Sequence, residues 1–139
     1  FDSNNYFDVF IEYAKNNSED VFIKIEIRNR GNETAPLTLL PTLWFHNKWQ
    51  YEDIVEKPSI DLLNNFSVQA VHPNLGNYYL YFPEPAHVLF TENETNFRKL
   101  FNRENTTEFV KDASHDAIID GNDFEKLQEK TQGTKFAPV

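Results

Sequence analysis

The feature that most constrains the fold is an apolar side chain at every second position in two segments near the N-terminus. Between positions 6 and 13, every second residue is apolar, namely Phe7, Val9, Ile11 and Tyr13. The alternation returns between positions 21 and 28, with Val21, Ile23, Ile25 and Ile27. Side chains of a β-strand point alternately to its two faces, so this period of two predicts two half-buried strands. The polar stretch 16–20 between them is typical of a turn and predicts an antiparallel hairpin.

Further strand-like segments follow at the short spacing that is typical of all-β domains. We expect a third strand from Leu37 to Phe45, apolar on both faces and interrupted by Pro41, and then an acidic loop from Trp49 to Asn65. Three more segments have strand patterns, namely Ser67–His72, Tyr78–Phe82 and Val88–Thr91. The chain is therefore predicted to be mainly β, an antiparallel β-sandwich.

After position 92 the apolar spacing becomes that of a helix. One helical face is predicted by Phe97, Leu100 and Phe101, which stand at i, i+3 and i+4. Asn93 or Thr95 is expected to cap this helix, and Phe124 with Leu127 predicts another helical turn. We thus expect a short helical excursion near 94–130 that wraps over the sandwich.

The chain length fits one domain, and we expect a single but incomplete β-sandwich domain over 1–139. The sequence begins with Phe1 and contains no Met, which predicts an excised or processed segment of a larger protein. An extended pattern resumes at Gly133 and stops at Val139, as expected for a strand that is cut short.

Composition excludes several classes of function. The formal net charge of −9 and the scattered Lys and Arg residues disfavour nucleic acid and anionic membrane surfaces as partners. The absence of Cys rules out disulfides and thiolate chemistry and leaves the compartment open. The His residues lack the spacing of a metal site, and the four Gly residues form no phosphate-binding loop. We therefore predict neither a metal nor a cofactor.

Two acidic residues are the candidates for glycosidase chemistry. Hydrolysis of a glycosidic bond uses two carboxyl groups that face each other across the sugar, and Glu92 and Glu94 stand two residues apart, the spacing of neighbours on one face of a strand. The favoured alternative is a structural role in hydrogen bonding at the junction between strand and helix. Asp112 and Asp116, at i and i+4, are expected to form a solvated acidic face.

Flat aromatic side chains are the other candidates, because sugar C–H faces pack against aromatic rings. Trp49 precedes polar and charged residues and is the candidate for an exposed sugar contact. Trp44 lies within the predicted third strand and is expected to fill the core.

Three long strings resemble a known family. The first is Tyr6-Phe7-Asp8-Val9-Phe10-Ile11-Glu12-Tyr13-Ala14-Lys15. The second is Ile27-Arg28-Asn29-Arg30-Gly31, which leads to Leu39-Leu40-Pro41-Thr42-Leu43-Trp44-Phe45. The third is Leu89-Phe90-Thr91-Glu92-Asn93-Glu94-Thr95-Asn96. Together they are similar to the N-terminal region of large bacterial glucosidase-like proteins, which are related to the mannosyl-oligosaccharide glucosidases of glycoside hydrolase family sixty-three. Val110-Lys111-Asp112 and Thr131-Gln132-Gly133-Thr134-Lys135 fit the same pattern in the same order.

The resemblance implies a supersandwich-type β-domain that precedes an (α/α) barrel carrying the general acid and general base. That barrel is absent from this chain, so no catalytic residue is transferred to it. The implied partners are the barrel of the same parent protein and an oligosaccharide, and a cytoplasmic location is slightly favoured. The candidates for substrate contact are Trp49, Glu92, Asn93, Glu94 and Asn96.

Three functions remain as alternatives. The leading hypothesis is a non-catalytic accessory domain of a glycoside hydrolase, which packs on the barrel and shapes the substrate entrance. The second is an independent carbohydrate-binding module. The third is a self-contained hydrolase that uses Glu92 and Glu94, and for this one we expect no turnover by the chain alone.

Overall fold

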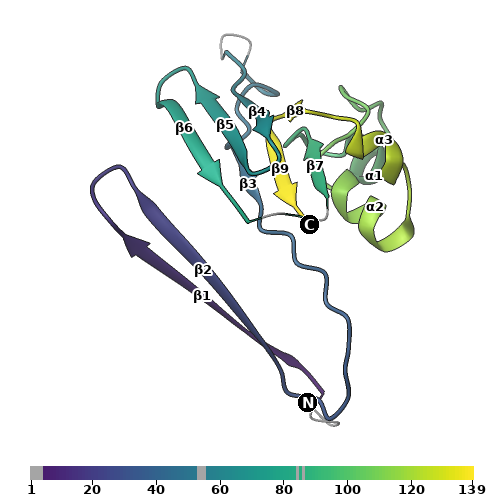
Figure 1. The fold of residues 1–139 in the computed structure, drawn as a ribbon. Coiled ribbons are helices and arrows are strands. Elements are labelled where there is room, and N and C mark those ends of the chain that lie inside the picture. The colour runs from purple at the N-terminus through teal and green to yellow at the C-terminus, as the bar shows by residue number, and fades with distance from the viewer. Residues whose placement is uncertain (1–4, 53–55, 84, 86) are drawn as a thin grey trace. The chain divides into compact units, whose positions relative to one another are not determined.

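The computed structural model describes residues 5–52, 56–83, 85 and 87–139. The chain is mainly β, its strand pairs are antiparallel, and its few helices are short. It divides into two compact units, Phe1–Thr38 and Leu39–Val139, which are described separately (Figure 1). The expectation of a single domain over 1–139 stays a prediction.

The first unit is the predicted hairpin. Strands β1 (Phe7–Lys15) and β2 (Val21–Asn29) pair antiparallel along their whole length, with Ile11 opposite Ile25. This register places the alternating apolar residues of both strands on one face and the charged residues on the other. The charged face carries ion pairs such as Lys24 with Glu12, at 3.2 Å between Nζ and Oε2.

The second unit begins with a four-stranded sheet. Its strands are β4 (Ser59–Asn64), β5 (Ser67–His72), β6 (Gly76–Tyr81) and the short β8 (Gln132–Gly133), in the order β6-β5-β4-β8. One face of this sheet is apolar because Val68 lies opposite Leu80 and Ala70 lies opposite Ile60. Beside the turn into β5, the register shifts between Leu62 and Asn64.

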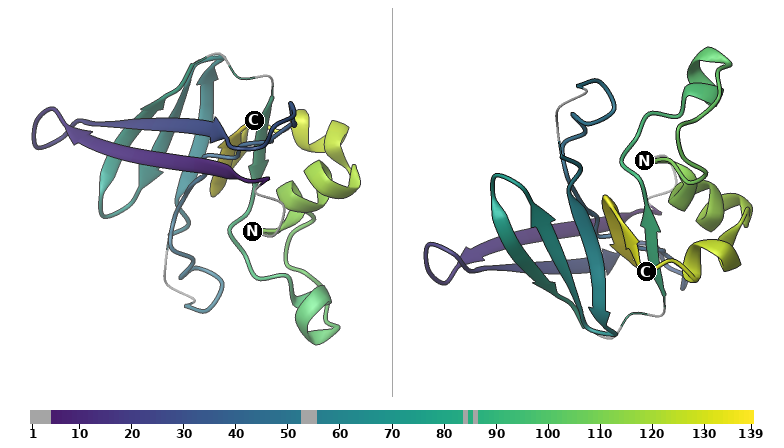
Figure 2. Two further views of the ribbon diagram at one scale, coloured as in Figure 1. Left: turned by 90° about the horizontal axis from the view of Figure 1, so that it is seen from below. Right: turned by 90° about the horizontal axis from the view of Figure 1, so that it is seen from above.

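A second sheet of three strands covers that apolar face. It contains β3 (Leu43–Trp44), β9 (Lys135–Pro138) and β7 (Val88–Thr91), in the order β3-β9-β7. Phe90 and Phe136 lie opposite each other in its register and join one buried cluster with Ile60, Val68 and Ala70 of the first sheet. The two sheets therefore form a sandwich with the main core between them (Figure 2).

The described residues of this unit include three short helices, of which the last two pack on β7 of the three-stranded sheet. They are α1 (Phe97–Phe101), α2 (Ala113–Asp120) and α3 (Phe124–Gln128). Leu127 of α3 and Ala117 of α2 are buried with Leu89 of β7 in a second apolar cluster. The helical excursion near 94–130 is confirmed, and α2 and α3 form a third layer beside β7 (Figure 1).

Several predicted boundaries were wrong. The third strand, expected from Leu37 to Phe45, is reduced to Leu43–Trp44, because Pro36 and Pro41 lack the N–H that a ladder requires. The expected loop from Trp49 to Asn65 contains strand β4, while its residues 53–55 lie outside the described part of the chain. Trp44 was expected in the core and is 54% exposed.

The helix cap was also placed wrongly. The side chain of Asn96, and not that of Asn93 or Thr95, caps α1 by accepting from the backbone N–H of Lys99 at 3.0 Å. Asp112 and Asp116, expected to form a solvated acidic face, are both partly exposed, and Nζ of Lys99 lies 3.5 Å from Asp112 and 4.0 Å from Asp116.

Candidate functional site

The segment that follows β7 is held by hydrogen bonds to three separate parts of the second unit. The N–H of Glu92 donates to the carbonyl of Phe109 at 2.8 Å. The N–H of Asn93 donates to Oγ1 of Thr134, and its side-chain amide donates to the carbonyl of Phe45, both at 2.8 Å. The segment 92–96 is therefore fixed although it belongs to no strand or helix.

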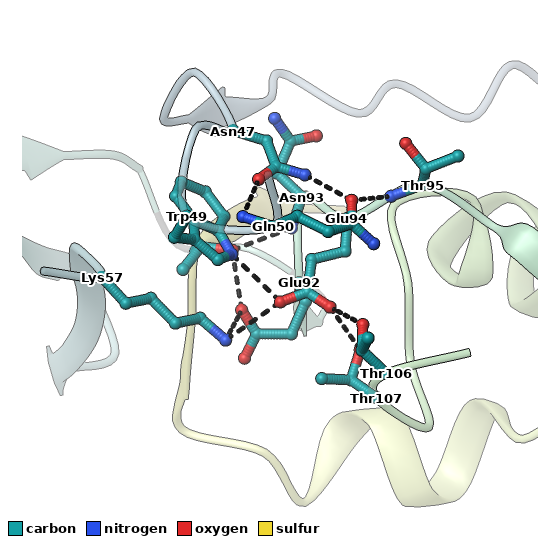
Figure 3. A network of polar contacts seen from close by, with 11 residues as sticks. Asn47, Trp49, Gln50, Lys57, Glu92, Asn93, Glu94, Thr95, Thr106 and Thr107 are labelled. Carbon is teal, nitrogen blue, oxygen red and sulfur yellow. Dashed lines mark hydrogen bonds and ion pairs between the residues drawn. The ribbon is translucent and has the colours of Figure 1, made fainter. Parts of the chain in front are cut away.

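Glu94 lies at the centre of a polar network (Figure 3). It is only 4% exposed. Its Oε1 accepts hydrogen bonds from Nε1 of Trp49 at 3.0 Å and from Nζ of Lys57 at 3.3 Å. Its Oε2 accepts from the hydroxyl of Thr106 and, at 3.4 Å, from that of Thr107. Both carboxylate oxygens are thus occupied by donors of the chain itself.

These contacts set the ionisation of Glu94. Burial alone would raise the pKa of this carboxyl group, but the hydrogen bonds from Thr106 and Trp49, together with the charge of Lys57, outweigh burial and lower the pKa below its ordinary value of 4.5. A catalytic general acid needs a raised pKa so that it still holds its proton near neutral pH. Glu94 has the opposite shift and is held as a carboxylate.

Glu92 is tied into the same network through Lys57. Its Oε2 lies 3.0 Å from Nζ of Lys57 and accepts from Oγ1 of Thr134 at 2.7 Å. Lys57 also lies 6.0 Å from the centre of the Trp49 ring, a cation–π distance. One ammonium group thus bridges the two carboxylates that the sequence suggests as a catalytic pair.

The loop around Trp49 is fixed by amide side chains. Oε1 of Gln50 accepts from the amide of Asn47 at 2.8 Å and from the backbone N–H of Thr95 at 3.0 Å. The hydroxyl of Tyr51 lies 2.8 Å from Oγ1 of Thr95, while its ring is exposed. Trp49, expected as an exposed contact, is partly buried with its N–H engaged, so the exposed ring beside the network belongs to Tyr51.

The structure brings together four of the five predicted site residues. Trp49, Glu92, Asn93 and Glu94 lie in or beside the Glu94 network. Asn96 belongs to a neighbouring set of contacts: its amide donates to both carboxylate oxygens of Asp112 at 3.1 Å. Sequence reasoning missed Lys57, Gln50 and the threonines Thr106, Thr107 and Thr134. No local pattern marks these residues, because each reaches the network across a long chain separation.

A cavity of about 360 Å³ lies beside Asn96, between the loop 103–112 and helices α2 and α3. Its apolar wall includes Phe109, Val110 and Leu127, and its polar wall includes Asp112 and Asp123. Nζ of Lys126 lies 2.7 Å from Asp123, and Lys99 approaches Asp112, so these carboxylates are already paired.

Within the described residues, no group of His and acidic side chains is arranged to hold a metal ion.

The fold and the site define a mainly β, sandwich-containing chain. In it, a network centred on the buried carboxylate of Glu94 joins two loops to the segment that follows β7. A similar protein is an uncharacterized protein of Saccharomyces cerevisiae, 29% identical over an alignment of 165 residues. This alignment includes 98% of the present chain and 15% of the yeast protein, so the chain spans about 15% of that relative's length. No protein-family model and no solved structure matches the chain. Among the residues that the structure describes, no helix is long and apolar enough to cross a membrane.

Proposed function

We propose that this chain is a non-catalytic accessory region of a glycoside hydrolase of the glucosidase type, which packs on a catalytic barrel and shapes the entrance to its active site. The string Phe90–Asn96, which carries much of the family resemblance, supplies the centre of the Glu94 network. The observation that carries the proposal is the burial of Glu94 among donors from two loops. Such a carboxylate positions loops and does not transfer protons.

The exposed ring of Tyr51 supports a role at an entrance. Tyr51 is fixed through Thr95 to the same network, so its ring is presented to solvent from a rigid support. A fixed aromatic surface binds a sugar ring at little cost in conformational entropy. Most of the yeast relative lies outside the region that matches this chain, which leaves ample length for a barrel domain.

The test compares variants in the full-length protein that contains this chain. Tyr51→Ala removes the exposed ring, and Trp49→Phe removes the indole N–H that donates to Glu94. We expect both variants to raise KM for gluco-oligosaccharides at least about threefold, which corresponds to the loss of a weak contact of roughly 0.7 kcal/mol. Values of kcat/KM for a short aryl glucoside, which does not reach the entrance, should remain unchanged.

Tyr78→Ala serves as the matched control, because Tyr78 is exposed and belongs to a different sheet. Unchanged oligosaccharide kinetics in both Tyr51→Ala and Trp49→Phe would refute the entrance role. Turnover of aryl glucosides by the 139-residue chain itself, abolished by Glu94→Gln, would instead establish the self-contained hydrolase.

A further inference from the structure

The outer face of the four-stranded sheet carries an ordered row of polar and aromatic side chains. In β4 and β5 the residues Ile60, Val68 and Ala70 point into the core. Their neighbours in sequence therefore point to the opposite face, because side chains alternate along a strand. The register places these neighbours side by side across the four strands, in the order Tyr79, Gln69, Asp61 and Gln132. We call these four residues the outer row.

Hydrogen bonds connect the members of the outer row. The amide of Gln69 donates to the hydroxyl of Tyr79 at 3.4 Å, and the amide of Gln132 donates to Oδ1 of Asp61 at 2.5 Å. Oδ2 of Asp61 accepts from the hydroxyl of Ser59 at 2.7 Å. Within the described residues, the amide oxygens of Gln69 and Gln132 accept no hydrogen bond. The row is thus ordered and keeps acceptors for a ligand.

Two aromatic rings lie at one end of this face. Tyr79 is 51% exposed, and Tyr81, two residues further along β6 on the same face, is 75% exposed. Helices α2 and α3 pack on the other sheet, and both tyrosine rings remain exposed. Exposed aromatic rings beside hydrogen-bonding side chains offer a sugar an apolar surface for its C–H face next to partners for its hydroxyl groups.

We propose that the outer row and Tyr81 form a binding face for a neutral, linear oligosaccharide that lies across the strands. The tyrosine rings would pack against the C–H face of one sugar unit, while Gln69, Asp61 and Gln132 would exchange hydrogen bonds with hydroxyl groups of the next units. Neighbouring strands are about 4.8 Å apart, so four strands span roughly 14 Å, which is longer than a single sugar ring.

The charges on this face select the ligand class. The outer row contains one carboxylate, Asp61, and neither Lys nor Arg, so it repels uronates and sulfated sugars. A protein partner would be expected to cover an apolar patch that is depleted of charge at its centre, whereas this face has Asp61 and two glutamines there. A neutral glycan with many hydroxyl groups matches the face better.

This inference goes beyond the proposed entrance role. The Glu94 network follows β7 of the three-stranded sheet, whereas the outer row lies on the four-stranded sheet. The outer row would bind a glycan whether or not a barrel beside it hydrolyses one. It is therefore tested by binding alone, and its failure would leave the kinetic test of Tyr51 and Trp49 unaffected.

The experiment titrates the 139-residue chain with maltohexaose, cellohexaose and, as an anionic control, oligogalacturonate, using isothermal calorimetry. At least one neutral hexasaccharide should bind with a Kd on the order of 1 mM or tighter, and oligogalacturonate should bind more weakly. Tyr79→Ala should raise the Kd about tenfold, whereas Tyr79→Phe, which keeps the ring, should retain most of the affinity.

Tyr78→Ala is a closely matched control. Tyr78 is adjacent in sequence and similarly exposed, at 54%, but it pairs with Ala70 and so belongs to the other face of the sheet. Its variant should bind like the unmodified chain. Circular dichroism verifies folding, and Tyr81→Ala replaces Tyr79→Ala if the latter fails to fold. The proposal is overturned if neither neutral hexasaccharide binds at about 10 mM, or if Tyr78→Ala loses as much affinity as Tyr79→Ala.

Discussion

At the residue scale, we expect Glu94 to contribute strongly to stability, because its buried carboxylate accepts hydrogen bonds from Trp49, Lys57 and Thr106. Glu94→Ala would leave the indole N–H of Trp49 and the hydroxyl of Thr106 without their acceptor. Hydrogen bonds to a charged acceptor contribute about 1.5–3 kcal/mol, so we expect the free energy of unfolding to fall by about 2 kcal/mol. Urea denaturation followed by tryptophan fluorescence measures this change. Glu104→Ala is the control, since the side chain of Glu104 is 90% exposed and its ion pair with Arg98 should contribute at most about 0.5 kcal/mol.

Because the pKa of Glu94 is lowered, its contribution to the free energy of unfolding should depend on pH. A carboxyl group with a lower pKa in the folded state than in the unfolded state stabilises the fold above its ordinary pKa of 4.5. That contribution is lost as the pH falls through the folded-state pKa. The difference in unfolding free energy between the unmodified chain and Glu94→Gln should therefore be constant near neutral pH and shrink below 4.5. A difference that grows toward acid would mean that the pKa of Glu94 is raised.

The sequence indicates which side chains are candidates for the site, but it does not indicate which residues they contact. Glu92, Glu94 and Trp49 are identifiable from residue type and from the strings around them. The contact between Trp49 and Glu94 spans 45 residues, and no periodicity extends across the intervening loops and strands. The ion pairs of Lys57 with Glu92 and Glu94 could not be predicted either, because a single Lys in an acidic stretch is typical of any solvent-exposed segment.

At the scale of elements, the chain changes sheets within a few residues at Gly133. Strand β8 ends at Gly133 in the four-stranded sheet, and β9 begins at Lys135 in the other sheet. Between them, the N–H of Thr134 donates to the carbonyl of Thr91 at 3.1 Å. This short crossing closes one corner of the sandwich and brings the backbone of Gly133 against β7.

Gly133→Ala should therefore be strongly destabilising. A Cβ atom at this position would lie 2.5 Å from the carbonyl oxygen of Thr91, a backbone atom that cannot move without breaking the corner. Overpacking of this kind costs about 1–3 kcal/mol, so we expect a decrease in the melting temperature of several degrees. Gly31→Ala is the control, because the atoms nearest to its Cβ would be side-chain ends of Asn29 and Asn5, which can move. Equal melting temperatures for Gly133→Ala and Gly31→Ala would contradict the assigned corner.

Element prediction from sequence succeeded where alternation was uninterrupted. Strands β1, β2, β5 and β7 were located to within two residues, since each has a regular pattern bounded by turn-forming residues. Strand β4 was missed because Leu62 and Leu63 break the alternation and the segment follows a Pro in an acidic stretch. Helix α2 was missed because Asp116 and Asp120 weaken its apolar face, which only the packing of Ala117 on β7 reveals.

At the scale of the whole molecule, the two units differ sharply in the burial of their side chains. No described residue of the first unit is buried, and β1 and β2 expose large apolar side chains such as Ile11 and Phe22. The second unit contains every buried residue of the two apolar clusters. Because a two-stranded hairpin without a packed face is marginally stable, the contacts within each unit predict very different local stabilities.

Hydrogen exchange of the backbone amides tests this difference directly. Amides of β5 are bonded between β4 and β6 over the main core and should exchange only through extensive unfolding, whereas amides of β1 and β2 should exchange through local opening of the hairpin. We expect the hairpin amides to exchange at least about 100-fold faster, a difference of about 2.7 kcal/mol in opening free energy. Exchange measured by mass spectrometry on peptides from residues 7–29 and 67–72 gives this ratio. Equal protection of the two regions would mean that the apolar face of the hairpin is covered in solution, and the stability of β1 and β2 would then depend on contacts beyond those within the hairpin.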